Sequence, residues 1–186
     1  MVDLGTGDGS FVLHRARAHL ESFFIGIDSN ADNLRESSHK AAKSTKKGGL
    51  PNALFVHANV EALPDELSGV ASEVTINLPW GSLLKAVALP DPLVLKEIAK
   101  LCQPKAILRI VFGYELSNEQ KIIEQLGLPT LDDHYLNTTL TQGYLEAGFA
   151  ITWQKLNQEA LKNYPTTWAK KLAYGKERLV IEIKGV

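Results

Sequence analysis

The first ten residues, MVDLGTGDGS, combine acidic side chains with closely spaced glycines. A short apolar segment leads to Asp3, and Gly5, Gly7 and Gly9 follow, with Asp8 between the last two. Glycines at such a turn let the backbone approach a ligand closely. The spacing is not the G-x-G-x-x-G of dinucleotide sites, and the negative charges of Asp3 and Asp8 would repel a phosphate group. The loop favours a cationic ligand, and S-adenosylmethionine, with its sulfonium and ammonium groups, is one.

Another acid follows the next apolar run. The segment from Phe23 to Ile27 is continuously apolar, as in a buried parallel strand, and it ends at Asp28. Asp28 lies a little more than twenty residues after Gly5, where an acid can accept hydrogen bonds from both ribose hydroxyls. A tight turn without any ligand is the alternative interpretation of the glycine loop alone. The acid at this spacing favours the nucleotide-like ligand.

Two tryptophans lie in segments rich in turn-forming residues. Pro79 fixes a turn after an apolar run and Trp80 follows, at a position expected to be exposed. Trp168 lies in PTTWAKK, and an aromatic side chain next to lysines can stack on an unpaired base while the lysines hold its phosphates. The alternative for Trp168, favoured when the segment is taken alone, is packing with Leu172 on an amphipathic helix.

The elements that must position these residues alternate along the chain. We expect strands at 23–27, 53–58, 73–78, 106–112, 149–156 and 179–183, and helices at 11–19, 31–45, 92–101 and 138–147. Ser117 with Gln120 predicts a capping box for a further helix. The alternation indicates an α/β fold with a mainly parallel sheet, a shortened first strand and an antiparallel closing hairpin. Ligands bind at the carboxyl ends of such strands, and we assign Trp153 to the core.

Length and composition predict one domain, residues 1–186. The chain is 45% hydrophobic and carries a net charge of −1, which by itself indicates no particular partner. It has no apolar run of 18 residues and no signal peptide before the glycine loop, so we expect a soluble cytoplasmic protein without a membrane partner. The single cysteine, Cys102, has no nearby metal-binding partners; we expect it to be buried and predict no metal site.

Positive charge gathers in two stretches. Residues 35–50 contain five basic residues and one acid, and residues 151–186 contain seven basic residues and three acids. Solvated lysines on helices and loops are the simpler interpretation of each cluster alone. We place both clusters in loops at the carboxyl edge of the sheet, where contact with a nucleic-acid backbone is the alternative.

Several motifs together resemble a known family. The segments VDLGTGDGS, IGID, A-x-x-E-A-L-P, NLPWGSLL and TTWAKKLAYGKER are similar to those of the aminoglycoside-resistance 16S rRNA (adenine-N1)-methyltransferases of the kanamycin-apramycin resistance type. The resemblance covers nearly the whole chain. It implies a Rossmann-like class I methyltransferase fold with a seven-stranded sheet, S-adenosylmethionine as cofactor, and the small ribosomal subunit as partner of a monomeric enzyme that confers aminoglycoside resistance.

The resemblance also implies a role for each group of site residues. The methionine part of the cofactor, its ribose and its adenine would contact Asp3, Gly5, Thr6, Gly7, Asp8, Asp28, Ser29, Asn59, Val60, Glu61 and Asn77. The flipped adenine would lie between Trp80 and Trp168, with Pro79 and Thr166 completing the catalytic set. The rRNA phosphates would contact Lys40, Lys43, Lys46, Lys47, Lys170, Lys171 and Arg178.

Two features depart from the family pattern. Family members have an N-terminal hairpin before the glycine loop, whereas Met1 lies only two residues before Asp3 here. The family commonly has serine two residues before the second tryptophan, where this chain has Thr166. A threonine hydroxyl can donate the same hydrogen bond, so we expect little loss from that change.

Other functions remain open from the sequence alone. A tRNA guanine-N7 methyltransferase would share the glycine loop, but its fourth strand should end in a basic P-D-P-W-P-K-K-R-H-like motif, which LPWGS does not match. A small-molecule methyltransferase would not need two tryptophans near positive charge, and a cofactor- or RNA-binding module without activity is a third possibility. Adenine N1 has a lone pair and no proton, so an rRNA adenine-N1 enzyme needs positioning rather than a general base.

Overall fold

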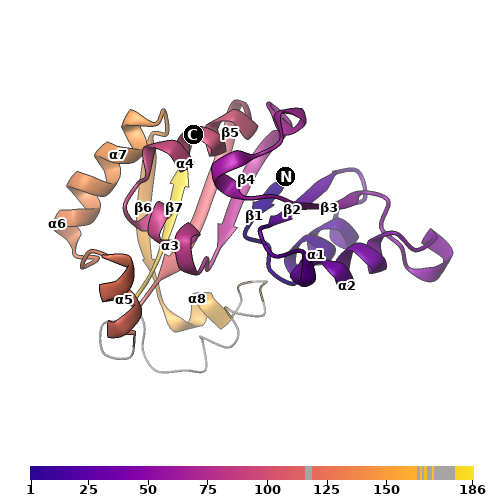
Figure 1. The fold of residues 1–186 in the computed structure, drawn as a ribbon, viewed down its shortest axis with the longest axis horizontal. Helices are drawn as coiled ribbons and strands as arrows, with labels where there is room; N and C mark the ends of the chain where they lie inside the picture. The colour runs from indigo at the N-terminus through magenta and orange to yellow at the C-terminus, as the bar shows by residue number, and fades with distance from the viewer. Residues whose placement is uncertain (116–118, 163, 165, 167–168, 170–178) are drawn as a thin grey trace.

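The computed structural model describes residues 1–115, 119–162, 164, 166, 169 and 179–186. Within these residues, seven strands form one sheet in the order β3-β2-β1-β4-β5-β7-β6 (Figure 1). The strands are β1 (Val2–Leu4), β2 (Phe24–Asp28), β3 (Ala53–His57), β4 (Ala71–Asn77), β5 (Cys102–Gly113), β6 (Ile151–Leu156) and β7 (Val180–Gly185). Only β7 runs antiparallel to the others in this part of the chain, which confirms the expected sheet.

The short first strand occupies the middle of the sheet. β1 has three residues, all buried, and it pairs in parallel with both β2 and β4. Its register places Asp3 beside Gly26 on one neighbour and Thr75 on the other. The glycine loop therefore emerges between the carboxyl ends of two strands, where the sequence predicted the ligand.

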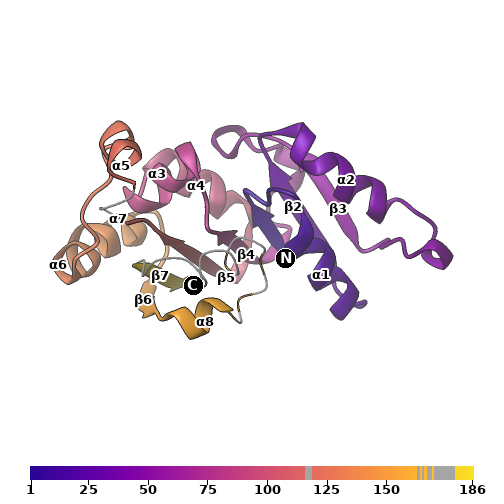
Figure 2. The ribbon, with the colours of Figure 1, turned by 90° about the horizontal axis from the view of Figure 1, so that it is seen from below.

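Helices pack on both faces of the sheet. Apolar residues of α1 (Ser10–Ala18) and α2 (Ala31–Ala41) form a small core with Phe24 of β2. The main core lies on the other face, where α3 (Gly81–Ala88), α4 (Pro92–Leu101) and α7 (Thr141–Glu146) contribute. Figure 2 shows α3 and α4 on one side of the later strands and α8 (Gln158–Lys162) on the opposite side.

Most predicted elements are confirmed, with differences at their ends. The helix expected at 92–101 is α4, and it begins with an Asp91 cap that accepts from the Leu93 and Val94 amides. The helix expected at 31–45 ends at Ala41. The one expected at 138–147 belongs to a longer helical segment of α6 (Asp133–Tyr135), a π-helical stretch (Leu136–Leu140) and α7. Ser117 lies outside the described residues, and α5 (Gln120–Leu126) begins after it.

Several elements were not predicted. The chain forms α3 directly after Trp80, and also α8, α6 and the short 3-10 turns Thr45–Lys47 and Asp65–Leu67. A further 3-10 turn, Val60–Ala62, follows β3 where a short turn was expected. α3 is amphipathic: it buries five of its eight residues and exposes Ser82 and Lys85, three positions apart on one face. The pattern spans only about two helical turns, which is too short for periodicity in the sequence to predict a helix.

Trp153 and Cys102, both expected in the interior, are each only half-buried. Trp153 packs against the main core, and its indole N–H donates to Asn137 Oδ1 at 3.2 Å. Cys102 has its Sγ 3.4 Å from the carbonyl oxygen of Ile98. Burial raises the pKa of this thiol.

The basic stretch at 35–50 does not lie where the sequence analysis placed it. α2 starts at the carboxyl edge of the sheet, after Asp28, and its 11 residues carry the chain about 16 Å back to the amino edge. The turn that contains Lys43, Lys46 and Lys47 precedes β3 and projects beyond the end of α2 (Figure 1). The prediction of a position at the carboxyl edge is wrong for these three lysines, because a crossover helix runs antiparallel to the strands that it connects.

Candidate active site

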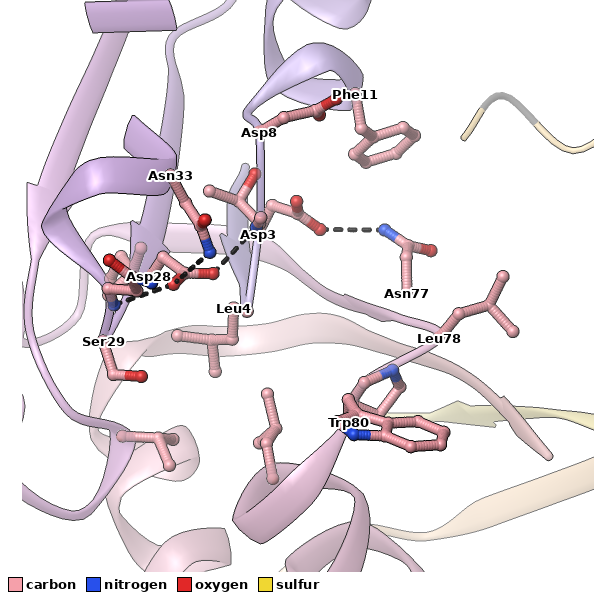
Figure 3. Close-up of a pocket in the computed structure, with 18 of the residues that line it drawn as sticks. Asp3, Leu4, Asp8, Phe11, Asp28, Ser29, Asn33, Asn77, Leu78 and Trp80 are labelled. Atoms are coloured by element: carbon pink, nitrogen blue, oxygen red, sulfur yellow. Dashed lines mark hydrogen bonds between the residues drawn. The ribbon is translucent and has the colours of Figure 1, made fainter. Parts of the chain in front are cut away.

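A cavity of about 590 Å³ opens at the carboxyl ends of β1, β2 and β4 (Figure 3). Thirteen of the predicted site residues line it: Asp3, Gly5, Thr6, Gly7, Asp8, Asp28, Ser29, Asn59, Val60, Asn77, Pro79, Trp80 and Thr166. Asp28 and Trp80 lie on opposite sides of the cavity in Figure 3. The volume is within the roughly 300–1,000 Å³ of small-molecule sites.

The glycine loop needs its glycines for two different reasons. Gly5, Gly7 and Gly9 have φ values of +68°, +56° and +68°, in the left-handed region that favours glycine. A Cβ on Gly9 would lie 2.4 Å from the Phe55 ring, so a side chain there would clash. A Cβ on Gly7 would meet nothing within 4 Å. The loop is therefore packed tightly on the protein side at Gly9 and open at Gly7.

Asp3 is a buried carboxylate at the floor of the cavity. It is 2% exposed, and its Oδ1 accepts hydrogen bonds from Thr75 Oγ1 at 2.7 Å and Asn77 Nδ2 at 2.8 Å. Burial raises the pKa of Asp3 to about 6, against the opposing effect of these hydrogen bonds. Near neutral pH the cavity thus contains a desolvated negative charge, which attracts a cationic ligand group.

Asp28 ends β2 and organises the other side of the cavity. Its Oδ2 accepts from the Gly7 amide at 2.8 Å, and its Oδ1 accepts from the Asn30 amide at 2.9 Å and Asn33 Nδ2 at 3.3 Å. A carboxylate has about four acceptor positions. Three of these are used by the protein, so one position on Oδ2 is left for a ligand hydroxyl. A second ligand hydroxyl would have to displace the long bond from Asn33.

The end of β4 forms the opposite wall. Leu78 has φ of +51°, which is uncommon for a non-glycine residue, and its amide donates to the Val111 carbonyl at 2.7 Å. This turn and Pro79 direct the chain back into α3. Trp80 is 59% exposed, as expected from the sequence. A large exposed aromatic ring at the rim of a cavity is suited to stacking on a planar ligand.

Thr166 brings the C-terminal part of the chain to the same cavity. Its amide donates to the Tyr164 carbonyl at 2.9 Å, and its Oγ1 accepts from the Ala169 amide at 3.1 Å. The hydroxyl proton is free to point elsewhere, because an accepted bond leaves the donor function intact. Trp168, the predicted partner of Trp80, lies outside the described residues.

Glu61 is the predicted cofactor residue that does not line this cavity. It is exposed and borders a neighbouring hollow of about 480 Å³ along α3 and α4. Ser82 lines both hollows, so they adjoin. Among the lysines predicted to contact RNA, Lys40 forms an ion pair with Glu36 at 2.6 Å. Lys170, Lys171 and Arg178 lie outside the described residues.

Ten further residues line the cavity and were not predicted from the sequence. These are Leu4, Ser10, Phe11, Ile27, Asn30, Asn33, Ala58, Leu78, Ser82 and Leu83. Asn33 was detectable in part, since it lies in the first turn of α2, three residues after the N-cap residue Asn30. In the described part of the chain, no three histidine, cysteine or acidic side chains are grouped so that they could hold a metal ion. No helix there has the length and apolar character needed to span a membrane.

Comparisons with known proteins identify the family. The family model of the 16S rRNA (adenine(1408)-N(1))-methyltransferases, NpmA, matches residues 1–186. A methyltransferase of that name from Escherichia coli is 38% identical over 186 residues, which cover 99% of this chain and 85% of that protein.

Two solved structures are also similar. The aminoglycoside resistance methyltransferase NpmB1 has 41% sequence identity and a TM-score of 0.86, with coverage of 100% of this chain and 86% of that one. A mutant 16S rRNA (adenine(1408)-N(1))-methyltransferase from Catenulisporales acidiphilia, with the cosubstrate SAM, has 31% identity and a TM-score of 0.88, with coverage of 100% and 84%. These matches confirm the class I methyltransferase fold and the resemblance found in the sequence. The chain belongs to the 16S rRNA (adenine(1408)-N(1))-methyltransferase family.

Proposed function

We propose that this protein uses S-adenosylmethionine to methylate N1 of the decoding-site adenine in 16S rRNA of the small ribosomal subunit, and that this confers aminoglycoside resistance. The observation that carries the proposal is one cavity with two unlike walls. Buried and half-buried carboxylates, Asp3 and Asp28, form one wall, and the exposed ring of Trp80 forms the other. The tRNA guanine-N7 alternative is not favoured, because the adenine-N1 family model matches the full chain.

The residues of the cavity fit the proposed cofactor. The ionised Asp3 carboxylate would accept from the ammonium group, and the open face of Gly7 leaves room for a close approach of the methionine part. Asp28 would accept from one ribose hydroxyl at its remaining position, and from the other once Asn33 moves. Ser29, Asn59 and Val60 would border the adenine, with Glu61 at the edge of the adjoining hollow.

The reaction requires positioning more than acid-base chemistry. Bound S-adenosylmethionine supplies an electrophilic methyl group on a positively charged sulfur. Adenine N1 has a lone pair and no proton, so the residues of the cavity would have to hold the base with that lone pair facing the methyl group, and none of them would have to remove a proton. Trp80 and Trp168 would stack on the flipped base, and Pro79 and Thr166 would fix its plane. Stacking is worth roughly 1–3 kcal/mol per base, which offsets the few kcal/mol of flipping.

The remaining proposals concern the partner. We expect the enzyme to act as a monomer in the cytoplasm and to hold rRNA phosphates through its lysines and Arg178. Lys43, Lys46 and Lys47 lie at the amino edge of the sheet, so they would contact a part of the subunit distant from the flipped base. The affinity for the subunit would then fall as salt rises.

The test is transfer of labelled methyl groups from S-adenosylmethionine to purified small ribosomal subunits, followed by reverse transcription across the decoding helix. We expect incorporation into 16S rRNA and a stop at the decoding adenine. Purified tRNA and free 16S rRNA serve as competing substrates. Incorporation into tRNA alone, or into neither RNA while the cofactor binds, would contradict the proposal.

A further inference from the structure

Tyr164 reaches the floor of the cavity, although neither its sequence context nor its position in the chain singled it out. Its hydroxyl donates a hydrogen bond to Asn77 Oδ1 at 2.9 Å. Asn77 Nδ2 donates to Asp3 Oδ1 at 2.8 Å, and Thr75 Oγ1 donates to that same oxygen at 2.7 Å. The bonds link the segment after α8 to the carboxyl ends of β4 and β1.

The hydrogen bonds from Tyr164 to Asn77 and from Asn77 to Asp3, here called the Tyr164 relay, fix the orientation of the Asn77 side-chain amide. An amide has one oxygen that accepts and one nitrogen with two protons to donate. Tyr164 donates to the oxygen, and the carboxylate of Asp3 accepts from the nitrogen. A flipped amide would turn its oxygen toward the carboxylate, and two acceptors would then face each other. The second proton on Asn77 Nδ2 is left for the cavity, which Asn77 lines.

The arrangement suits a ligand that carries both the ammonium and the carboxylate of an amino acid. Asp3 presents an acceptor for an ammonium, and Asn77 presents a donor for a carboxylate beside it. Burial raises the pKa of the Tyr164 phenol well above its usual value, so the hydroxyl keeps its proton across the physiological range. The relay therefore delivers a constant donor to Asn77.

Tyr164 also anchors the segment that carries Thr166. Its side chain packs against the cluster of Val111, Leu161 and Val180, and its amide donates to the Leu161 carbonyl at 3.1 Å. The Tyr164 carbonyl in turn accepts from the Thr166 amide at 2.9 Å. One residue thus has its side chain on the cofactor wall and its main chain on the wall expected to hold the target base.

We propose that Tyr164 is a positioning residue, which orients the Asn77 amide toward the cofactor and ties the Thr166 segment to the cavity. The proposal rests on the proposed binding of S-adenosylmethionine beside Asp3. It implies that the cofactor site and the segment that contains Thr166 are coupled through one hydrogen bond, from the Tyr164 hydroxyl to Asn77 Oδ1. Tyr164 itself does not touch the reacting atoms.

The test is Tyr164→Phe, which removes one oxygen and keeps the packed ring. Calorimetry with S-adenosylmethionine alone should show an affinity about 5- to 10-fold weaker than that of the wild type, the size expected when a buried carbonyl loses its partner. Tyr135→Phe is the matched control, because that hydroxyl donates to the Ala88 carbonyl at 2.7 Å, at the far end of α3. The control should bind the cofactor like the wild type.

A double variant separates positioning from a general effect on stability. With Asn77→Ala in place the bond has no acceptor, so adding Tyr164→Phe should cause no further loss of affinity. Wild-type affinity in Tyr164→Phe, or an equal additional loss in the Asn77→Ala background, would overturn the proposal. These measurements use no RNA, so they stand even if the methylation test on ribosomal subunits fails.

Discussion

Asp3→Asn should make the protein more stable at alkaline pH while weakening the cofactor site. Burial raises the pKa of Asp3 to about 6 in the folded state, against an ordinary value of 3.8. Because the folded carboxyl has the higher pKa, the folded state binds its proton more tightly than the unfolded chain does. The free energy of unfolding therefore falls as pH rises from about 4 through 6, and the loss is complete above the folded pKa.

The size of the effect follows from the shift. About two pKa units at 1.36 kcal/mol each give about 3 kcal/mol at pH 8, of which roughly half develops between pH 5 and pH 8. Asparagine removes the charge, and its oxygen can still accept from Thr75 and Asn77, which both donate to Oδ1 in the wild type. The stability difference between Asp3→Asn and the wild type should therefore widen by roughly 1 to 2 kcal/mol over that range.

Urea unfolding at pH 5 and pH 8 measures this difference. Glu66→Gln, a change at an exposed acid, is the control and should shift stability little at either pH. A stability difference that stays constant or shrinks as pH rises would refute the assignment of a destabilising buried charge. Calorimetry on the same variant should show S-adenosylmethionine binding weakened by roughly 10- to 150-fold, as expected for loss of a hydrogen bond to a charged group.

Three further predictions concern the walls and the distant lysines. Trp80→Ala should abolish methylation of small subunits and leave calorimetric affinity for S-adenosylmethionine nearly intact, because the ring is exposed at the rim; loss of cofactor binding would remove it from the base site. Gly9→Ala should lower the free energy of unfolding by about 2 kcal/mol or more, because the new Cβ would clash with Phe55. Gly7→Ala should lower it by only about 1 kcal/mol, for the left-handed backbone alone. Equal losses of the two variants in urea titrations would contradict the tight packing at Gly9. The double variant Lys46→Glu, Lys47→Glu should weaken binding to the small subunit and reduce the salt dependence of that affinity, without changing the affinity for the cofactor. An unchanged salt dependence in a binding titration would show that this turn does not contact the RNA.

The sequence predicted the parts of this site that depend on local pattern. A buried apolar run that ends in an acid identifies both the strand and the residue at its carboxyl end, as for Asp28. The same logic placed Asp3 and the glycine loop, because parallel strands carry their loops to one edge of the sheet. Trp80 was found because proline before an aromatic residue interrupts such a run.

The features that were missed depend on distant parts of the chain. The bond from Tyr164 to Asn77 joins residues 87 positions apart, and no local pattern encodes it. The exposed residues of α3, Ser82 and Lys85, lie three positions apart on one face, but a helix of eight residues is too short for this pattern to predict it. The lysines after α2 were placed at the wrong edge, because charge composition carries no information on the direction of a crossover helix.

The two walls of the cavity are built on different kinds of element, and this division fits the proposed chemistry. Asp3, Thr75 and Asn77 stand on β1 and β4, central strands whose register is fixed on both sides. Trp80 and Thr166, in contrast, lie outside the strands at the rim, and Trp80 is joined to β4 through Leu78, whose φ is +51°. A cofactor wall on paired central strands would hold the methyl donor in line, as a reaction without a general base requires. A rim beyond the strand ends leaves room for a base that arrives from outside, and the Tyr164 bond keeps the two walls in register.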